Sequence, residues 1–144
     1  MKLKEIYIKE KLKVDRADED TTSFQIEIDG DVKGEIITTE VIDGTYHIEF
    51  DDIPEEERDK IFTAERLLKL DGLETYDQGK GYAKELMNHV IKWAKRKKYK
   101  QLFLNASPMG SGLSLGPLTN FYKKFGFEVI KKQGPNNQML MNLK

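Results

Sequence analysis

The chain of 144 residues contains no cysteine, and this absence excludes several kinds of chemistry. Disulfide frameworks, thiolate zinc sites, iron–sulfur centres and cysteine nucleophiles all need the missing thiol. A chain without disulfides fits a reducing compartment best. Histidine is almost as scarce, because His47 and His89 are the only two and neither has a paired ligand nearby in the sequence. Neither residue therefore indicates a metal site or serine–histidine catalysis.

Long apolar runs are also missing. The first residues, MKLKEIYIKEKLKV, alternate charged and apolar side chains and never give the uninterrupted apolar stretch of a signal peptide or membrane span. No repeat, linker or low-complexity tract interrupts the chain, whose length suits one domain of roughly 100 to 150 residues. We therefore expect a soluble cytoplasmic protein with a single domain over residues 1–144 and no membrane partner.

Charge is plentiful but unevenly distributed. The formal net charge is only -1, yet residues 1–60 hold 19 acids against 9 bases, and residues 61–144 hold 6 acids against 15 bases. The two parts therefore carry -10 and +9, which suits the second part to an anion and the first to a cation. The alternative is that acids and bases fell on different loops and helices without a functional reason.

Apolar periodicity predicts strands in the first part of the chain. Residues 3–14 and 24–29 alternate apolar and polar side chains, the period of a strand with one solvated face. Residues 32–50 are rich in Val, Ile, Thr and Tyr, and Asp43-Gly44 predicts a hairpin turn between two paired strands. A short helix is expected from Pro54 to about Phe62.

The second part alternates strands and helices. We expect strands at 64–74, 101–106, 127–132 and 138–143, helices at 79–98 and 118–125, and a loop at 107–117. The helix at 79–98 has apolar residues at three- and four-residue steps: Tyr82, Leu86, Met87, Val90, Ile91 and Ala94. This order predicts a mixed α/β (α+β) fold, a mostly antiparallel sheet with helices packed on it.

The segment between the strand at 64–74 and the long helix has the composition of an anion site. Gly79 and Gly81 lie at the helix entrance, where backbone amides lack internal partners and the helix dipole is positive, and Lys80 adds a mobile cation. A phosphate or pyrophosphate fits such a place, although a plain loop has the same composition. The segment is neither a Walker sequence nor a dinucleotide fingerprint.

Two motifs resemble one family. Gln78-Gly79-Lys80-Gly81-Tyr82-Ala83 matches the (Arg or Gln)-x-x-Gly-x-(Gly or Ala) signature of the GCN5-related N-acetyltransferases, the GNAT family. Residues 120–127, NFYKKFGF, are similar to the ending of that family's late helix. The resemblance covers roughly residues 64–144.

The resemblance implies a cofactor and a place for it. Acetyl-CoA (coenzyme A) would lie where two central parallel strands, 64–74 and 101–106, splay apart. Pantetheine would pair with the backbone of Leu73, Glu74 and Thr75. The pyrophosphate would bind the amides of Gln78, Gly79, Lys80, Gly81, Tyr82 and Ala83. Physical chemistry agrees with both placements, because an amide-rich ligand can satisfy unpaired strand groups and anions suit helix N-termini.

Two further residues are candidates for contacts with the reacting atoms. Tyr122 matches the family's tyrosine near the CoA sulfur and would act as general acid or as a hydrogen-bond donor to the leaving thiolate. Its alternative role is packing in the core. Asn105, at the end of the second splayed strand, would bond the pantetheine arm or the acetyl group, or else cap a loop.

No general base is evident from the sequence, and the acceptor wall departs from the family pattern. If Leu73 takes the family's end-of-strand position, strand alternation puts Asp71 and Lys69 on its face and Glu74 on the opposite one. We consider Asp71, then Glu74, as the base. The family's two helices after the first strand are missing, because residues 15–50 are typical of strands and hairpins.

These observations predict an acetyl-CoA-dependent N-acetyltransferase acting on a primary amine, by direct attack without a covalent enzyme intermediate. The acidic first part favours a cationic acceptor: a protein lysine, a polyamine or a basic small molecule. The competing hypothesis is a non-catalytic acyl-CoA-binding or protein-interaction domain. Nucleic acid is not an expected partner, since the six bases in residues 92–100 complement a helix C-terminus. A monomer or a homodimer is expected.

Overall fold

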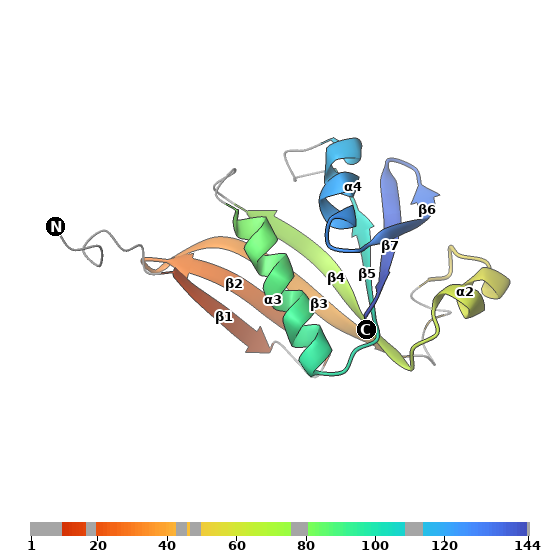
Figure 1. Ribbon diagram of the computed structural model, residues 1–144, viewed down its shortest axis with the longest axis horizontal. Coiled ribbons are helices and arrows are strands. Elements are labelled where there is room, and N and C mark those ends of the chain that lie inside the picture. The colour runs from red at the N-terminus through yellow and green to blue at the C-terminus, as the bar shows by residue number, and fades with distance from the viewer. Residues whose placement is uncertain are drawn as a thin grey trace.

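The computed structural model describes residues 10–16, 20–42, 46, 50–75, 81–108 and 114–143. They form one seven-stranded sheet in the order β1-β2-β3-β4-β5-β7-β6, shown in Figure 1. Its strands are β1 Glu10–Arg16, β2 Thr21–Ile28, β3 Asp31–Ile42, β4 Arg66–Thr75, β5 Gln101–Ala106, β6 Glu128–Gln133 and β7 Asn136–Asn142. Neighbouring strands are antiparallel except β4 and β5, which are parallel. The predicted mixed α+β fold is confirmed.

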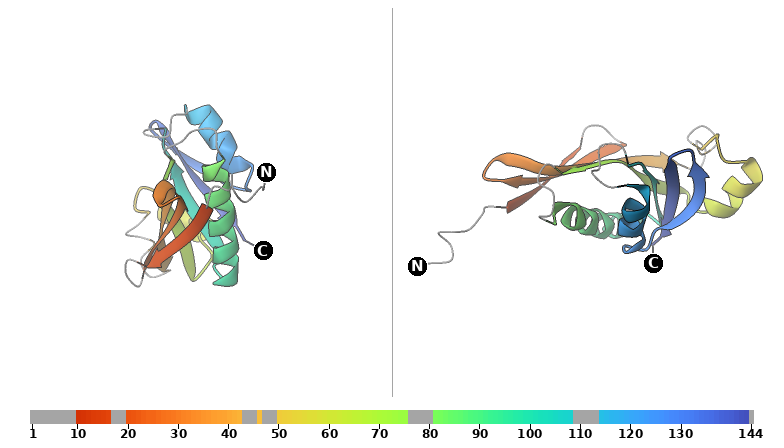
Figure 2. Two further views of the ribbon diagram at one scale, coloured as in Figure 1. Left: turned by 90° about the vertical axis from the view of Figure 1, so that its left-hand side faces the viewer. Right: turned by 90° about the horizontal axis from the view of Figure 1, so that it is seen from above.

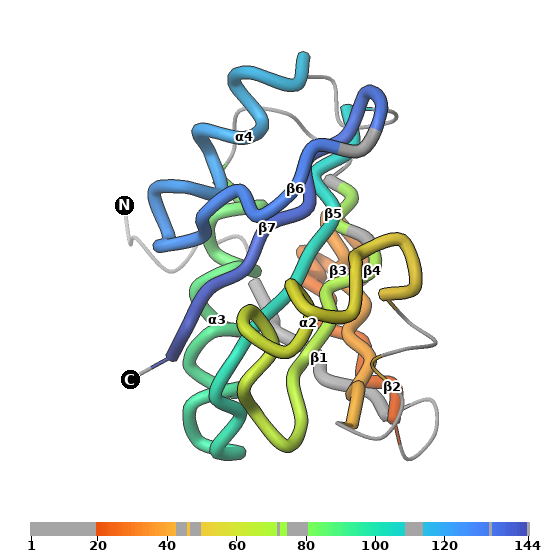
Figure 3. The backbone as a smooth tube through the Cα atoms, turned by 90° about the vertical axis from the view of Figure 1, so that its right-hand side faces the viewer, coloured from red at the N-terminus to blue at the C-terminus, as the bar shows by residue number. Residues whose placement is uncertain are grey.

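Helices cover the sheet unequally on its two faces. Helices α3 (Tyr82–Arg96) and α4 (Leu115–Lys123) share one face, and α2 (Glu55–Ile61) lies at the end of the molecule near β6 and β7 (Figures 2 and 3). Alternation in β5 shows how the core is divided. Leu102 and Leu104 belong to the buried cluster of α3 and α4, and Phe103 to a second cluster with Phe50 and Phe62 beside α2. We call these the α3/α4 face and the α2 face.

The hairpin predicted after β3 is wrong in its second strand. Asp43 and Gly44 lie outside the described residues, but Tyr46 is helical and its carbonyl oxygen accepts a hydrogen bond from the Phe50 amide at 2.9 Å. Tertiary packing overrides strand propensity here, because both rings are buried and the Tyr46 hydroxyl donates to the Ala64 carbonyl oxygen at 2.6 Å. Residues 46 and 50 therefore cover the α2 face instead of extending the sheet.

The same Asp-Gly signal does mark a turn fourteen residues earlier. Asp29 and Gly30 join β2 to β3 with φ angles of 52° and 87°, the left-handed values that a tight two-residue hairpin needs. The sheet continues from this hairpin, since β3 pairs with β2 on one side and β4 on the other. The described residues from β1 to the end of β3 form no helix, so the strands predicted over residues 24–29 and the first part of 32–50 are found.

Residues 3–9 of the first predicted strand lie outside the described residues, and its remainder belongs to β1; the other predicted elements are found with small shifts at their ends. Helix α2 follows Pro54, and α3 spans most of the predicted helix. Helix α4 begins at Leu115, three residues earlier than predicted, and contains Pro117 in its first turn, where a missing N–H costs no hydrogen bond. None of the helices formed by the described residues is long and apolar enough to cross a membrane.

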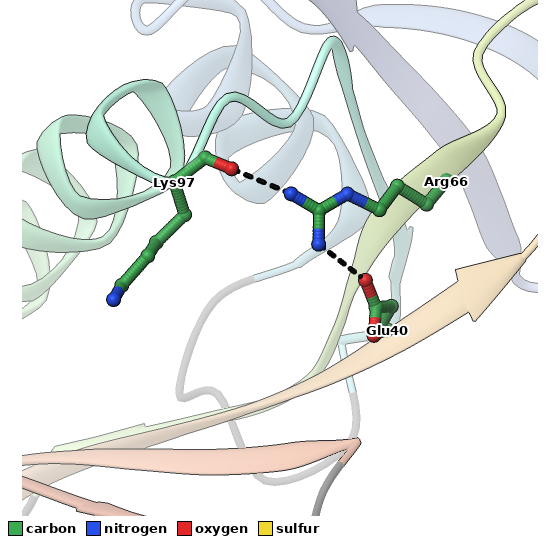
Figure 4. A network of polar contacts seen from close by, with 3 residues as sticks. All are labelled: Glu40, Arg66 and Lys97. Atoms are coloured by element: carbon green, nitrogen blue, oxygen red, sulfur yellow. Dashed lines mark hydrogen bonds and ion pairs between the residues drawn. The ribbon is translucent and has the colours of Figure 1, made fainter.

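Arg66 links three elements at the end of the sheet where β4 begins. Its guanidinium lies 2.9 Å from the Glu40 carboxylate of β3 and donates to the Lys97 carbonyl oxygen at 2.7 Å (Figure 4). It also stands 4.6 Å from the centre of the Tyr99 ring. This side chain thereby joins β3, β4 and the C-terminus of α3. The parallel pairing of β4 with β5 begins close to this end, at Leu68 and Leu102.

Candidate active site

The site is built where β4 and β5 separate. Their parallel pairing comprises Leu68 with Leu102, Lys69 with Phe103 and Leu70 with Leu104. Beyond Leu70, β4 continues to Thr75 with pairs on its β3 side only, and Figure 1 shows the two strands diverging. Among the described residues, the β5-facing backbone groups of this part of β4 therefore have no strand partner. The predicted splayed pair is present, and we call its opening the mouth.

A β-bulge in β4 accounts for the separation. The β3–β4 register shifts from Thr38 opposite Leu70 to Ile37 opposite Gly72, so Asp71 is an extra residue with no residue of β3 opposite it in the register. A bulge bends its strand and increases the local twist, which turns the rest of β4 away from β5. Gly72 is the signal in the sequence, because an isolated glycine inside a strand pattern marks a bulge.

The bulge also reverses the predicted alternation of side chains. Leu73 packs against the buried cluster of the α3/α4 face, whereas Lys69 is paired with Phe103 on the α2 face. Asp71 accepts a short hydrogen bond from Thr39, which pairs with Lys69, and therefore shares its face. The prediction that Asp71 and Lys69 share the face of Leu73 is wrong, since one extra residue exchanges the two faces.

Glu74 joins Asp71 on the α2 face for the same reason. It is exposed and stands opposite Glu35 of β3, whose carboxylate accepts hydrogen bonds from Ser23 at 3.1 Å and Gln25 at 2.6 Å. Strand β2 buries the alternate residues, such as Phe24, on the α3/α4 face. The two carboxyl groups proposed as bases are thus on one face of one strand.

Asp71 and Asn105 border the mouth from its two sides. Leu70 and Leu104 form the last parallel pair, so Asp71 and Asn105 are the first residues beyond it on each strand, and both side chains are exposed. Asp71 also lies 3.6 Å from the Lys69 ammonium. Carboxylate and amide groups therefore face solvent on the α2 face at the point where the strands part.

A fourth carboxylate is brought to the same face from outside the sheet. Gln138 of β7 pairs with Asn105, and its Nε2 donates to the Asp52 carboxylate at 2.7 Å. The Lys131 ammonium donates to the Asp52 carbonyl oxygen. Asp52 precedes α2, so the loop that enters this helix adds negative charge on the β5 side of the mouth.

The start of α3 lies beyond the end of β4. Gly81 precedes the helix with φ 78°, its carbonyl oxygen accepts from the Glu85 amide at 3.0 Å, and Tyr82 and Ala83 are the first helical residues. Gly81 has no side chain to cap the helix, and first-turn amides of a helix are suitable donors to a bound anion. Gln78, Gly79 and Lys80 lie outside the described residues, and Thr75 ends β4 opposite Gly34.

Tyr122 approaches the site from the α3/α4 face. It lies on α4, is 9% exposed, and belongs to the same buried cluster as Leu70 and Leu104. Its ring packs against Phe127 and Phe121 at centroid distances of 6.1 and 5.3 Å. Burial raises the pKa of its hydroxyl to about 12. The group is therefore neutral, a hydrogen-bond donor, over the whole physiological pH range.

One buried polar pair was not predicted from the sequence. Asn137 of β7 donates from Nδ2 to the Thr119 hydroxyl of α4 at 3.0 Å, and both side chains are buried. Nothing in the sequence marks either residue, because Asn after Gly-Pro is typical of a turn and Thr near a helix start is typical of a cap. In the described ranges, no three His, Asp or Glu side chains gather as metal ligands.

The comparisons with known proteins identify the family. The model of the acetyltransferase (GNAT) family matches residues 3–127, and the chain belongs to this family. The match extends well into the first sixty residues, where the motifs gave little guidance. No curated protein sequence matched the chain.

Solved structures share the fold at low sequence identity. A PaiA N-acetyltransferase from Thermoplasma acidophilum, in complex with coenzyme A, has a TM-score of 0.59 at 19% identity over 86% of this chain. A GNAT family acetyltransferase from Elizabethkingia anophelis with acetyl-CoA bound has a TM-score of 0.57 at 14% identity over 86% of this chain. The ribosomal-protein-S18-alanine N-acetyltransferase from Escherichia coli has a TM-score of 0.59 at 13% identity over 88% of this chain. The match spans 62%, 77% and 72% of those chains, respectively.

Proposed function

We propose that this protein is an acetyl-CoA-dependent N-acetyltransferase that transfers an acetyl group to a cationic primary amine. The observation that carries the proposal is the splayed pair of β4 and β5: in the part of the chain that the structure describes, their pairing ends at Leu70 and Leu104, while β4 continues toward the start of α3. Family membership and the fold shared with CoA-bound acetyltransferases support the same conclusion.

The residues present fit the cofactor. The amide groups of pantetheine match the backbone groups of β4 from Asp71 to Thr75, in the manner of a peptide added to a sheet edge. The pyrophosphate suits the amides at Gly81, Tyr82 and Ala83 and, from the sequence, Gln78, Gly79 and Lys80. These elements belong to the part of the chain whose net charge is +9.

Acetyl-CoA supplies an acetyl group already activated as a thioester. Tyr122 stabilises the departing thiolate by donating a hydrogen bond. Full proton transfer is unfavourable, because its pKa of about 12 lies well above that of a thiol, about 8.5. The bulge exposes backbone groups of β4 outside the ladder, and an N–H there polarises the reacting carbonyl.

Asp71 is the proposed proton acceptor. Its carboxylate stands at the mouth on the α2 face, held by the Thr39 hydroxyl and near the Lys69 ammonium. Through a water molecule it takes the proton that the attacking amine must lose. Glu74 is the second candidate, one step further along the same strand face. Asn105 is placed to hydrogen-bond the pantetheine arm or the acetyl group across the mouth.

The acceptor enters from the α2 face, because α3 and α4 occupy the other face. That face carries carboxylates around the mouth from Glu35, Asp52, Asp71 and Glu74, against Lys69 and Lys131. A negative field concentrates cations and disfavours acidic amines. We therefore propose a protein lysine, a polyamine or a basic small molecule as acceptor.

Two measurements test this function in sequence. Calorimetric titration with acetyl-CoA should give a Kd below about 100 μM, in the usual range of enzyme–substrate affinities; no binding would remove both cofactor and mechanism. Thiol release is then followed with a panel of cationic, neutral and acidic amines, lysine peptides included. Turnover confined to cationic amines supports the proposal. Tight binding without transfer to any amine would instead identify a non-catalytic acyl-CoA-binding domain.

A further inference from the structure

Asn137 and Thr119 form a polar contact inside an otherwise apolar layer. Each side chain is 6% exposed, and Asn137 Nδ2 donates to Thr119 Oγ1 at 3.0 Å. The next residues on the same face of β7 are Met139 and Met141, and Leu118 of α4 is also buried. This hydrogen bond therefore lies between β7 and α4, where apolar packing alone would join them.

The position of the pair connects it to the mouth. Asn137 stands opposite Ala106, the last residue of β5, so it is attached to the strand that forms one side of the mouth. Thr119 precedes Tyr122 by three residues on α4, and residues at this spacing share a helix face. The bond thus links the strand beside the mouth to the helix that carries Tyr122.

Asn137 and Thr119 are not the pair of side chains that would stabilise the fold most at these two positions. Asn137 Oδ1 is buried and has no hydrogen-bond partner in the part of the chain that the structure describes. An apolar pair of similar volume would leave no buried acceptor without a partner. What the polar pair adds is orientation. Rotating α4 by one residue, about 100°, would remove Thr119 from Asn137 and leave the buried Asn137 amide without this hydrogen bond.

We propose that Asn137 is a positioning residue for Tyr122, which fixes the rotation and height of α4 through Thr119. The inference rests on the proposed role of Tyr122 in acetyl transfer. Asn137 itself does not contact the reacting atoms. Its contribution is to hold the Tyr122 hydroxyl at the depth from which it can reach a thiolate in the mouth.

The decisive variant replaces the pair by apolar residues of similar volume, Asn137→Leu with Thr119→Val. We expect an unchanged or higher melting temperature, because the buried acceptor is gone. With lysine peptides as acceptors, kcat should fall about ten- to hundredfold while the KM for acetyl-CoA stays the same, the cost of a misplaced group. Adding Tyr122→Phe should then lower kcat by less than the same substitution does in the wild type. A wild-type kcat in the double variant would overturn the proposal.

Two further variants separate positioning from packing. Thr119→Ser retains the hydroxyl and should retain kcat. Asn142→Ala is the matched control, since Asn142 is also on β7 but accepts its hydrogen bond from Gln101 at the far end of the strand. It should leave kcat unchanged. If Asn142→Ala lowered kcat as much as the apolar pair does, Asn137 would have only a structural role.

A spectroscopic measurement tests the position of Tyr122 without relying on turnover. In protein labelled with ¹³C at tyrosine Cζ, the Tyr122 resonance is assigned by its loss in Tyr122→Phe. Wild type and Asn142→Ala should give one sharp line, and the apolar pair a shifted or broadened line. An identical line in the apolar pair would refute positioning. If Tyr122→Phe leaves kcat intact, the proposed hydrogen-bond donor role fails, and this spectrum alone decides the role of Asn137.

Discussion

The two faces of the sheet meet at the same mouth but are built differently. On the α3/α4 face, buried side chains of both helices continue up to Tyr122, and the layer is almost entirely apolar. On the α2 face, aromatic packing around Phe103 ends where the parallel pairing ends, and carboxylates follow. Under the proposed function, this difference would divide the reaction between the faces. The closed face would supply a neutral hydrogen-bond donor, and the open face would supply the charges that act on an amine.

The largest expected effect concerns the closed face. Tyr122→Phe removes the hydroxyl and keeps the ring that packs against Phe127. We expect kcat to fall at least about 100-fold, the usual contribution of a positioned acid or donor, with little change in the affinity for acetyl-CoA. Steady-state kinetics and calorimetry measure the two quantities. Equal losses in both would reduce Tyr122 to a packing residue and end the proposed division between the faces.

Two neighbouring isoleucines of β3 compare how much each face of the sheet contributes to the stability of the fold. Ile36 is 1% exposed on the α3/α4 face, and Ile37 is 36% exposed on the opposite face. Ile36→Ala should lower the free energy of unfolding by about 2–5 kcal/mol. Ile37→Ala should lower it by less than about 1 kcal/mol. Urea unfolding of the pair tests this, and similar losses would mean that the open face is covered in solution.

The sequence predicted the closed face better than the open one, for physical reasons. The apolar spacing of α3 and the run at 101–106 are local patterns, so the elements that place Tyr122 and the start of α3 could be found. The faces of β4 could not, because one bulged residue at Asp71 reverses alternation. The buried Asn137 was also missed, since its partner Thr119 is distant in sequence.

The same contrast explains the failure at Asp43-Gly44. The dipeptide favours a hairpin locally, and Asp29-Gly30 forms one between β2 and β3. After β3, however, burying Tyr46 and Phe50 against Phe62 and Phe103 stabilises a helical turn instead. Contacts between residues this far apart in the chain cannot be predicted from a short stretch of sequence. Local patterns therefore could not predict that Tyr46 and Phe50 cover the α2 face.

A smaller effect follows from the buried hydroxyl at high pH. The folded-state pKa of Tyr122 is about 12, above the ordinary value of about 10, because burial disfavours the charged form. The contribution of this pKa shift to the free energy of unfolding is therefore complete below pH 10 and is lost as the pH rises toward 12. At pH 11 the free energy of unfolding is lower by about 1.4 kcal/mol. Urea unfolding of wild type between pH 8 and 11.5 should show it relative to Tyr122→Phe, and parallel curves would contradict the burial.

The smallest expected effect tests the charge of the open face. With acetyl-CoA saturating, the KM of a cationic acceptor should rise a few-fold between about 0.05 and 0.5 M salt, because salt screens exposed charges beyond about 10 Å. A neutral amine should show no such rise. Glu74→Gln, at the mouth, should weaken the salt dependence, whereas Glu128→Gln, an exposed acid on the outer strand β6, should not. A cationic acceptor whose KM ignores salt would leave the acids of this face without a role in recognition, and acceptor choice would then follow shape.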